Sequence, residues 1–133
     1  MKKLYHISHP ENHQSIASNG LLSNEDGEIF LFNAWKIAPA NNHAATVLIA
    51  DVIAYNQLGL EEYIIVEIDP KGIKSKLIPD NVGEATAKFQ FIANQNKIHK
   101  EYSKIIGLRQ IELEKIIQFQ FSLYRSKMQV IRV

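Results

Sequence analysis

The sequence predicts a single α+β domain over residues 1–133, with one short helix and six or more strands around one buried central helix. At least six short segments are rich in β-branched and aromatic residues or alternate between polar and apolar ones. One longer segment, residues 43–57, has a helical pattern that is apolar nearly all round. Strands and helices do not alternate regularly along the chain, which favours α+β over a doubly wound parallel sheet.

The N-terminal part is expected to hold two strands separated by a short helix. Residues 3–8 and 28–33 are predicted to be strands because they are apolar or alternate in polarity. A proline fits the first turn of the helix expected over 10–18, and Gly20 supplies its end. This helix should bury Ile16 and Ala17.

The clearest helix covers residues 43–57. Asn41 or Asn42 can cap its start, and Gly59 ends it. Apolar residues surround almost the whole helix, which is typical of a helix buried on all sides. We therefore expect it at the centre of the fold, with residues 34–40 forming the loop that precedes it.

The next part of the chain is predicted to be mainly β-structure. Residues 63–68 are strongly β-branched, which indicates a central strand, and residues 69–72 have turn chemistry. Shorter strands are expected over 73–78, 88–93 and 102–106.

The C-terminal tail fits two periodicities. Alternation of polar and apolar residues favours a strand over 116–124 and a last strand over 128–132. Leu113, Ile117 and Phe121 also satisfy helical spacing. We favour the two strands, whose edge could pair with a second copy of the chain.

Composition places the chain among ordinary globular proteins. Hydrophobic residues make up 46% and charged residues 22%, with a net charge of +1. Such a charge gives no strong electrostatic case for nucleic-acid binding. There are no cysteines, and no apolar run is long enough to cross a bilayer or to resemble a secretory signal. We expect a cytoplasmic protein with no membrane contact.

Several chemistries lack the residues that they need. His9 and His13 are four apart, but a proline between them starts the helix and no acidic partner follows at ligand spacing, so no metal site is expected. There is no Gly-x-Ser-x-Gly motif for a serine hydrolase. The six glycines are too scattered to form a phosphate-binding loop.

His6 and Ser8 share one face of the first strand, because alternate residues of a strand point the same way. A neutral histidine and a serine can each donate and accept a hydrogen bond. At a cleft edge this pair suits the two hydroxyls of a ribose. The alternative is that His6 is a half-buried structural histidine and Ser8 begins a turn.

Three segments in order carry a resemblance to a known family. They are the sequences Leu-Tyr-His-Ile-Ser at residues 4–8, Ser-Ile-Ala-Ser-Asn-Gly-Leu at 15–21 and Glu-Ile-Phe-Leu-Phe at 28–32. Together they resemble the front half of an ADP-ribosyltransferase-like domain, a group that includes RNA 2′-phosphotransferases and ADP-ribosyltransferase toxins. The similarity continues to about residue 106. It implies split antiparallel sheets with a cleft for NAD.

The resemblance also implies roles for particular residues. His6 matches the family histidine that holds a ribose, with Ser8 beside it. Gly20, in the Gly-Leu helix end of the family pattern, is also expected to be a cofactor-binding residue. Phe30 or Phe32 stands where the family often has a tyrosine that stacks on nicotinamide. Trp35, just after this strand, is expected either to cover the nicotinamide or to anchor the core.

Gln90 is the departure from the family pattern. Family transferases commonly carry a glutamate at this strand position, which stabilises the positive charge that develops as nicotinamide leaves. A neutral amide can hold a hydroxyl but supplies no charge. Glu84 and Glu101 are the nearest acidic substitutes, although neither is in register. Arginines for the phosphotransferase pattern are also scarce, since none precedes His6.

Three functions therefore remain open at this stage. The first is an NAD-dependent ADP-ribosyl or phosphoryl transferase with His6 and Gln90 as catalytic residues and a nucleic acid or protein as acceptor. The second is a non-catalytic module on the same fold that binds a nucleotide or a protein. The third is a small α+β domain without a nucleotide site.

Overall fold

The computed structural model describes residues 2–35, 43–80 and 87–132 and is a mixed α+β fold. Its main sheet has six strands in the order β5-β6-β3-β1-β4-β8, and every neighbouring pair is antiparallel. The strands are β1 (Leu4–Ser8), β3 (Ile29–Phe32), β4 (Glu62–Ile68), β5 (Leu77–Pro79), β6 (Gln90–Ala93) and β8 (Ser103–Gln110). A separate two-stranded ribbon pairs β2 (Leu21–Leu22) with β7 (Lys97–Ile98).

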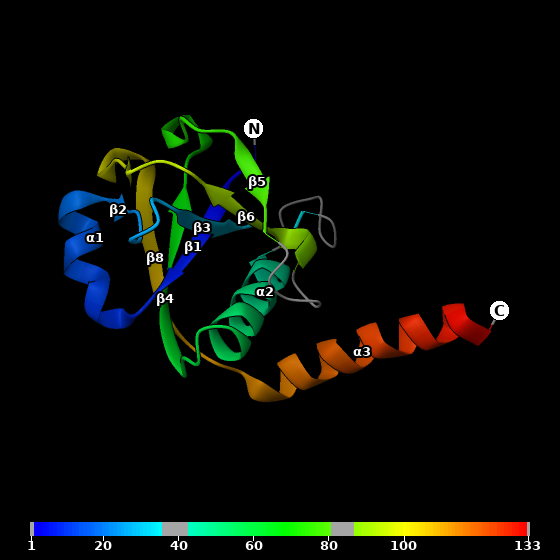
Figure 1. Ribbon diagram of the computed structural model, residues 1–133. Helices are drawn as coiled ribbons and strands as arrows, with labels where there is room; N and C mark the ends of the chain where they lie inside the picture. The colour runs from blue at the N-terminus through cyan, green and yellow to red at the C-terminus, as the bar shows by residue number, and fades with distance from the viewer. Residues whose placement is uncertain (1, 36–42, 81–86, 133) are drawn as a thin grey trace.

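Helices cover both faces of the main sheet (Figure 1). Helix α1 (His13–Asn19) lies on one side, and helix α2 (His43–Asn56) lies on the other. The apolar side chains form two clusters accordingly. Tyr63 and Ile65 join the cluster around α2, while Ile64 and Val66 join the cluster around α1. Because β4 is buried on both faces, its sequence is a continuous apolar run rather than an alternating one.

The main sheet has one weak seam, between β1 and β3. These strands pair at a single position, Tyr5 with Phe32. In contrast, β1 pairs with β4 along Leu4–Ser8, and β3 pairs with β6 along Ile29–Phe32. The sheet is therefore two three-stranded halves that meet at one residue pair and open beyond it.

Most of the predicted elements are confirmed within the described residues. The first two strands, the central strand and the helix starting at residue 43 lie where the sequence places them, and Gly20 ends α1 with a φ of 76°. Ile16 is buried as expected, but Ala17 is exposed. The strand expected over 73–78 is shorter and later, and the one expected over 102–106 extends to residue 110. Asn41 and Asn42 lie outside the described residues.

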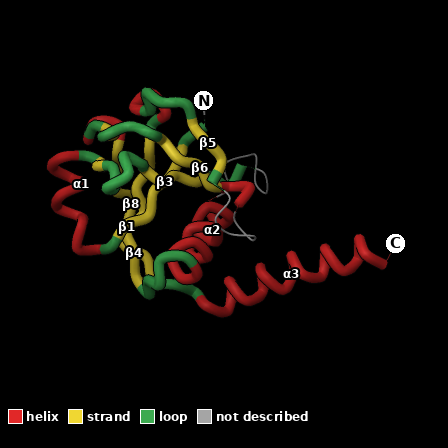
Figure 2. The backbone as a smooth tube through the Cα atoms, in the orientation of Figure 1, coloured by secondary structure: helices red, strands yellow, loops and turns green. Residues whose placement is uncertain are grey.

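The C-terminal prediction is wrong, because residues 113–132 form the helix α3 (Leu113–Arg132) instead of two strands. Ile116 is buried, and Phe119 packs against the cluster around α2. Residues three apart lie on one side of a helix but on opposite sides of a strand, so a helix lets Ile116 and Phe119 both face the body of the protein. Beyond this contact, α3 projects away from the body (Figures 1 and 2).

No helix in the described part of the chain is both long and apolar enough to cross a bilayer.

Candidate functional site

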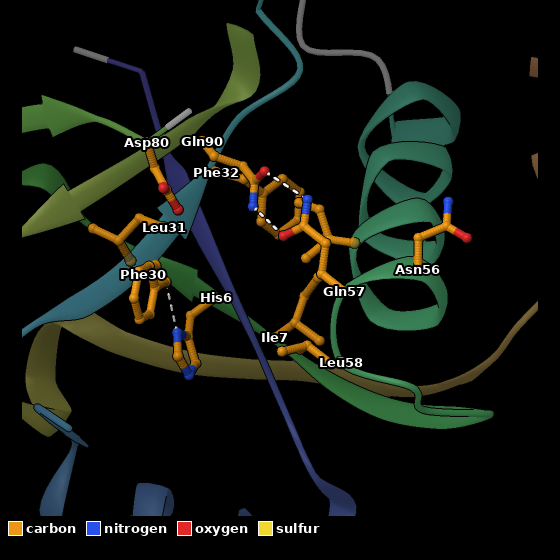
Figure 3. Close-up of a pocket in the computed structure, with 11 residues that line it drawn as sticks. His6, Ile7, Phe30, Leu31, Phe32, Asn56, Gln57, Leu58, Asp80 and Gln90 are labelled. Carbon is orange, nitrogen blue, oxygen red and sulfur yellow. Dashed lines mark hydrogen bonds between the residues drawn. The ribbon is translucent and has the colours of Figure 1, made fainter. Parts of the chain in front are cut away.

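A pocket of about 550 Å³ lies beside the seam where β1 and β3 part, between the sheet and the C-terminal end of α2 (Figure 3). Most of its surface is apolar, and a few polar side chains enter it. Its lining combines residues of β1, β3, β6 and α2 with the segments that follow α2 and β5. The lining residues are His6, Ile7, Phe30, Leu31, Phe32, Ile53, Asn56, Gln57, Leu58, Asp80 and Gln90.

The His6 side chain bridges the seam. Its Nδ1 lies 2.8 Å from the carbonyl oxygen of Phe30, at a point where β1 and β3 no longer pair. Since a carbonyl only accepts, Nδ1 carries the proton, and in the neutral ring Nε2 is an acceptor. Burial lowers the pKa of His6 from its ordinary value of 6.5, although the hydrogen bond to Phe30 acts in the opposite direction. The ring is therefore held in one orientation and favours the neutral form.

The two phenylalanines of β3 differ in exposure. Phe32 is only 2% exposed, and its ring packs against Tyr5 with the centroids 5.7 Å apart. Phe30 is 41% exposed, although it lines the same pocket. Phe30 is thus the aromatic side chain that a ligand can reach, while Phe32 forms part of the core behind it.

Gln90 is joined to Gln57 by two reciprocal hydrogen bonds (Figure 3). The Gln57 amide nitrogen donates to the Gln90 side-chain oxygen at 2.9 Å, and the Gln90 amide nitrogen donates back at 2.7 Å. Gln90 is 5% exposed, whereas Gln57 is exposed, and the amide pair ties β6 to the residue that follows α2.

Asp80 places a carboxyl group at the pocket, a feature that the sequence pattern does not single out. It follows β5 directly, and its backbone N–H donates to the Gln90 carbonyl at 3.0 Å, so the two residues lie side by side. Its side chain is 5% exposed. The sequence Pro-Asp-Asn at 79–81 has turn chemistry, so only the strand register identifies Asp80 as a neighbour of Gln90.

The structure describes one of the two acidic residues that the sequence offers as substitutes for the family glutamate. Glu101 lies on a 3₁₀ turn (Lys100–Tyr102) and is not among the lining residues. Glu84 lies outside the described residues.

Three other sequence-predicted site residues lie elsewhere. Ser8 accepts a hydrogen bond from the Asn12 side chain at 2.7 Å, as expected for a residue at a turn, and does not line the pocket. Gly20 packs directly on the backbone of residues 98–100, far too closely for any side chain. Trp35 is 45% exposed, and the Lys2 ammonium lies 3.6 Å from the centre of its ring.

A second buried polar cluster stabilises the fold away from this pocket. Asp51 of α2 is 1% exposed and accepts a hydrogen bond of 2.6 Å from the Tyr63 hydroxyl. The other Asp51 oxygen is 3.3 Å from the backbone nitrogen of Glu112, just before α3. Burial and the nearby carboxylate raise the pKa of Tyr63 far above its ordinary value of 10.0. Asp51 therefore connects α2 to β4 and to the start of α3, and this explains an acidic residue within an apolar helix.

Among the residues that the structure describes, no three acidic or histidine side chains are close enough to share a metal ion. What the pocket can bind follows from one oriented imidazole, one reachable phenyl ring, an amide pair and a carboxyl group. Comparisons of the chain with protein-family models, with curated proteins and with solved structures find no match.

Proposed function

We propose that this chain is an ADP-ribosyltransferase-like protein that binds NAD or a related nucleotide in the pocket beside the β1–β3 seam. The proposal rests on the convergence of four candidate residues on one pocket. His6, Phe30, Phe32 and Gln90, which the family resemblance selects from separate parts of the sequence, line one pocket of about 550 Å³. A mostly apolar pocket of this size with a few polar groups is typical of a small-molecule site.

The side chains suit a nicotinamide riboside. The Nε2 lone pair of His6 can accept a hydrogen bond from a ribose hydroxyl, because Nδ1 already donates to Phe30. The reachable ring of Phe30 offers a stacking surface for nicotinamide. The amide of Gln90, which Gln57 orients, adds a polar group to the pocket lining.

The opening of the sheet also supports the proposal. Two three-stranded halves that share one residue pair resemble the split antiparallel sheets that the family pattern implies. The pocket lies beside this split.

Calorimetric titration with NAD tests the binding. We expect saturable binding to the wild-type chain and an affinity about tenfold lower for His6→Ala, on the scale of one lost hydrogen bond and its positioning effect. His9→Ala is the matched control, because His9 is an exposed histidine that does not line the pocket. The absence of saturable binding, or equal losses in the two variants, would contradict the proposal.

A non-catalytic nucleotide-binding module is a second candidate, favoured by the Gln57–Gln90 amide pair. Gln90 supplies no negative charge to an oxocarbenium-like centre, and its amide is already engaged by Gln57. Nicotinamide release from NAD separates the candidates. A module binds NAD without release, and Gln90→Glu then gains release. If the wild-type chain releases nicotinamide steadily, this second candidate is wrong and NAD is a substrate.

A further inference from the structure

Helix α3, which projects away from the body in Figure 1, carries a stripe of exposed apolar side chains. Leu113 is 44% exposed, Ile117 56% and Phe121 54%. Residues four apart follow one another along the same side of a helix, so these three form a single apolar stripe. The buried Ile116 and the packed Phe119 lie on another side of the helix. The apolar stripe is therefore not the side by which α3 packs on the body.

The sequence extends the apolar stripe toward the end of α3. From Ile117 onward, apolar residues fall at positions 121, 124, 128 and 131, in alternating steps of four and three. This spacing is the one by which two helices pack along each other over several turns. The pattern therefore indicates that the partner of the stripe is another long helix.

The charges along α3 favour a second copy of α3 as that helix. Glu112 and Glu114 lie at its start, where the single basic residue is Lys115, which pairs with Glu112 at 2.8 Å. Residues 123–132 contain two arginines and one lysine and no acidic residue. A parallel pair of α3 helices would place these basic ends together, whereas an antiparallel pair places each basic end against an acidic one. The helix is thus complementary to itself, as a two-fold symmetric interface requires.

We propose that the apolar stripe of α3 is a dimer interface, through which two copies of the chain pair as antiparallel helices. Pairing removes the exposed apolar side chains of both copies from water, which drives association. The separation of charge along α3 sets the orientation. None of the residues that line the pocket beside the β1–β3 seam belongs to α3, so the inference does not depend on NAD binding.

Sedimentation velocity over a concentration series tests the pairing. We expect the wild-type chain to be mainly dimeric at about 100 µM. Ile117→Glu should raise the dissociation constant at least about tenfold, because each copy would bring an unpaired charge into the apolar interface. Gln118→Glu is the matched control, since it adds the same charge at an exposed position off the stripe and should leave dimerisation nearly unchanged.

Two results would overturn the dimer interface. One is a wild-type chain that stays monomeric at about 100 µM. Its co-sedimentation with phosphatidylserine vesicles would then assign the apolar stripe to a lipid surface. The other is an equal dissociation constant for Ile117→Glu and Gln118→Glu, both shown to be folded by circular dichroism. The wild-type measurement is decisive even if Ile117→Glu does not fold.

Disulfide cross-linking tests the orientation, because the chain has no cysteine of its own. Phe121 lies near the middle of α3, so Phe121→Cys should form a disulfide between the two copies. Leu113 is the first residue of α3, and the two copies of this position are about 28 Å apart in a fully overlapping antiparallel pair. Leu113→Cys should therefore remain unlinked under the same oxidising conditions. Faster cross-linking of Leu113→Cys than of Phe121→Cys would overturn the antiparallel arrangement.

Discussion

Gly20 offers the sharpest test of how the fold constrains the sequence. Its φ is 76° and its ψ is −166°, a combination that side chains exclude almost completely. A Cβ at this position would lie 2.7 Å from the Lys100 nitrogen and 2.9 Å from the His99 carbonyl carbon, and closer still to the Ile98 oxygen. All three contacts are backbone atoms beside β7, so a side chain could be accommodated only by separating α1 from this segment.

Gly27 provides a matched control for Gly20. Its φ is 74°, almost the same, but nothing lies within 4 Å of a Cβ built on it. Gly27→Ala should lower the free energy of unfolding by about 1 kcal/mol, from backbone strain alone. Gly20→Ala adds the backbone clash and should lower it by about 3 kcal/mol or more. That is a large share of the roughly 5–15 kcal/mol typical of a domain.

Urea denaturation followed by far-ultraviolet circular dichroism measures both variants against the wild type. Equal losses for Gly20→Ala and Gly27→Ala would refute the reasoning from close packing. NAD titration of the same variants tests the cofactor role that the sequence suggested for Gly20. A Gly20→Ala chain that is as stable as the Gly27→Ala chain but no longer binds NAD would restore that role.

Two further predictions concern buried polar groups. Because the pKa of folded His6 is below 6.5, the unfolded chain takes up the proton first as the pH falls. The free energy of unfolding should therefore decline as the pH falls through 6.5 toward the pKa of His6 in the folded chain. This part of the decline should be absent in His6→Asn. If the free energy of unfolding of the wild type and of His6→Asn depended on pH in the same way, the prediction for His6 would be wrong. Tyr63→Phe removes the hydrogen bond to the buried Asp51 and should cost about 2 kcal/mol in urea denaturation, whereas a loss below about 0.5 kcal/mol would show that Asp51 finds another donor.

The predicted strands and central helix depended on local periodicity, and such patterns can be read without knowing the fold. The apolar helix α2 and the β-branched strand β4 are examples, because each is buried by neighbours on every side. The tail shows the limit of this reading. Residues 116–124 fit both a strand and a helix. Burial of Ile116, together with the packing of Phe119 against the cluster around α2, favours the helix.

By itself, the sequence determined the α+β class, the first two strands, the helix that Gly20 ends and the residues His6, Phe30, Phe32 and Gln90 as candidates for one site. Their convergence depended on strand pairing between distant segments, which no local pattern records.

Only the tertiary structure distinguished reachable Phe30 from buried Phe32, paired Gln90 with Gln57 and placed Asp80 at the pocket. The physical reason is the same in each case. Exposure, amide pairing and the neighbourhood of a carboxyl group are set by contacts between elements, and the chain sequence specifies these contacts only through the fold as a whole.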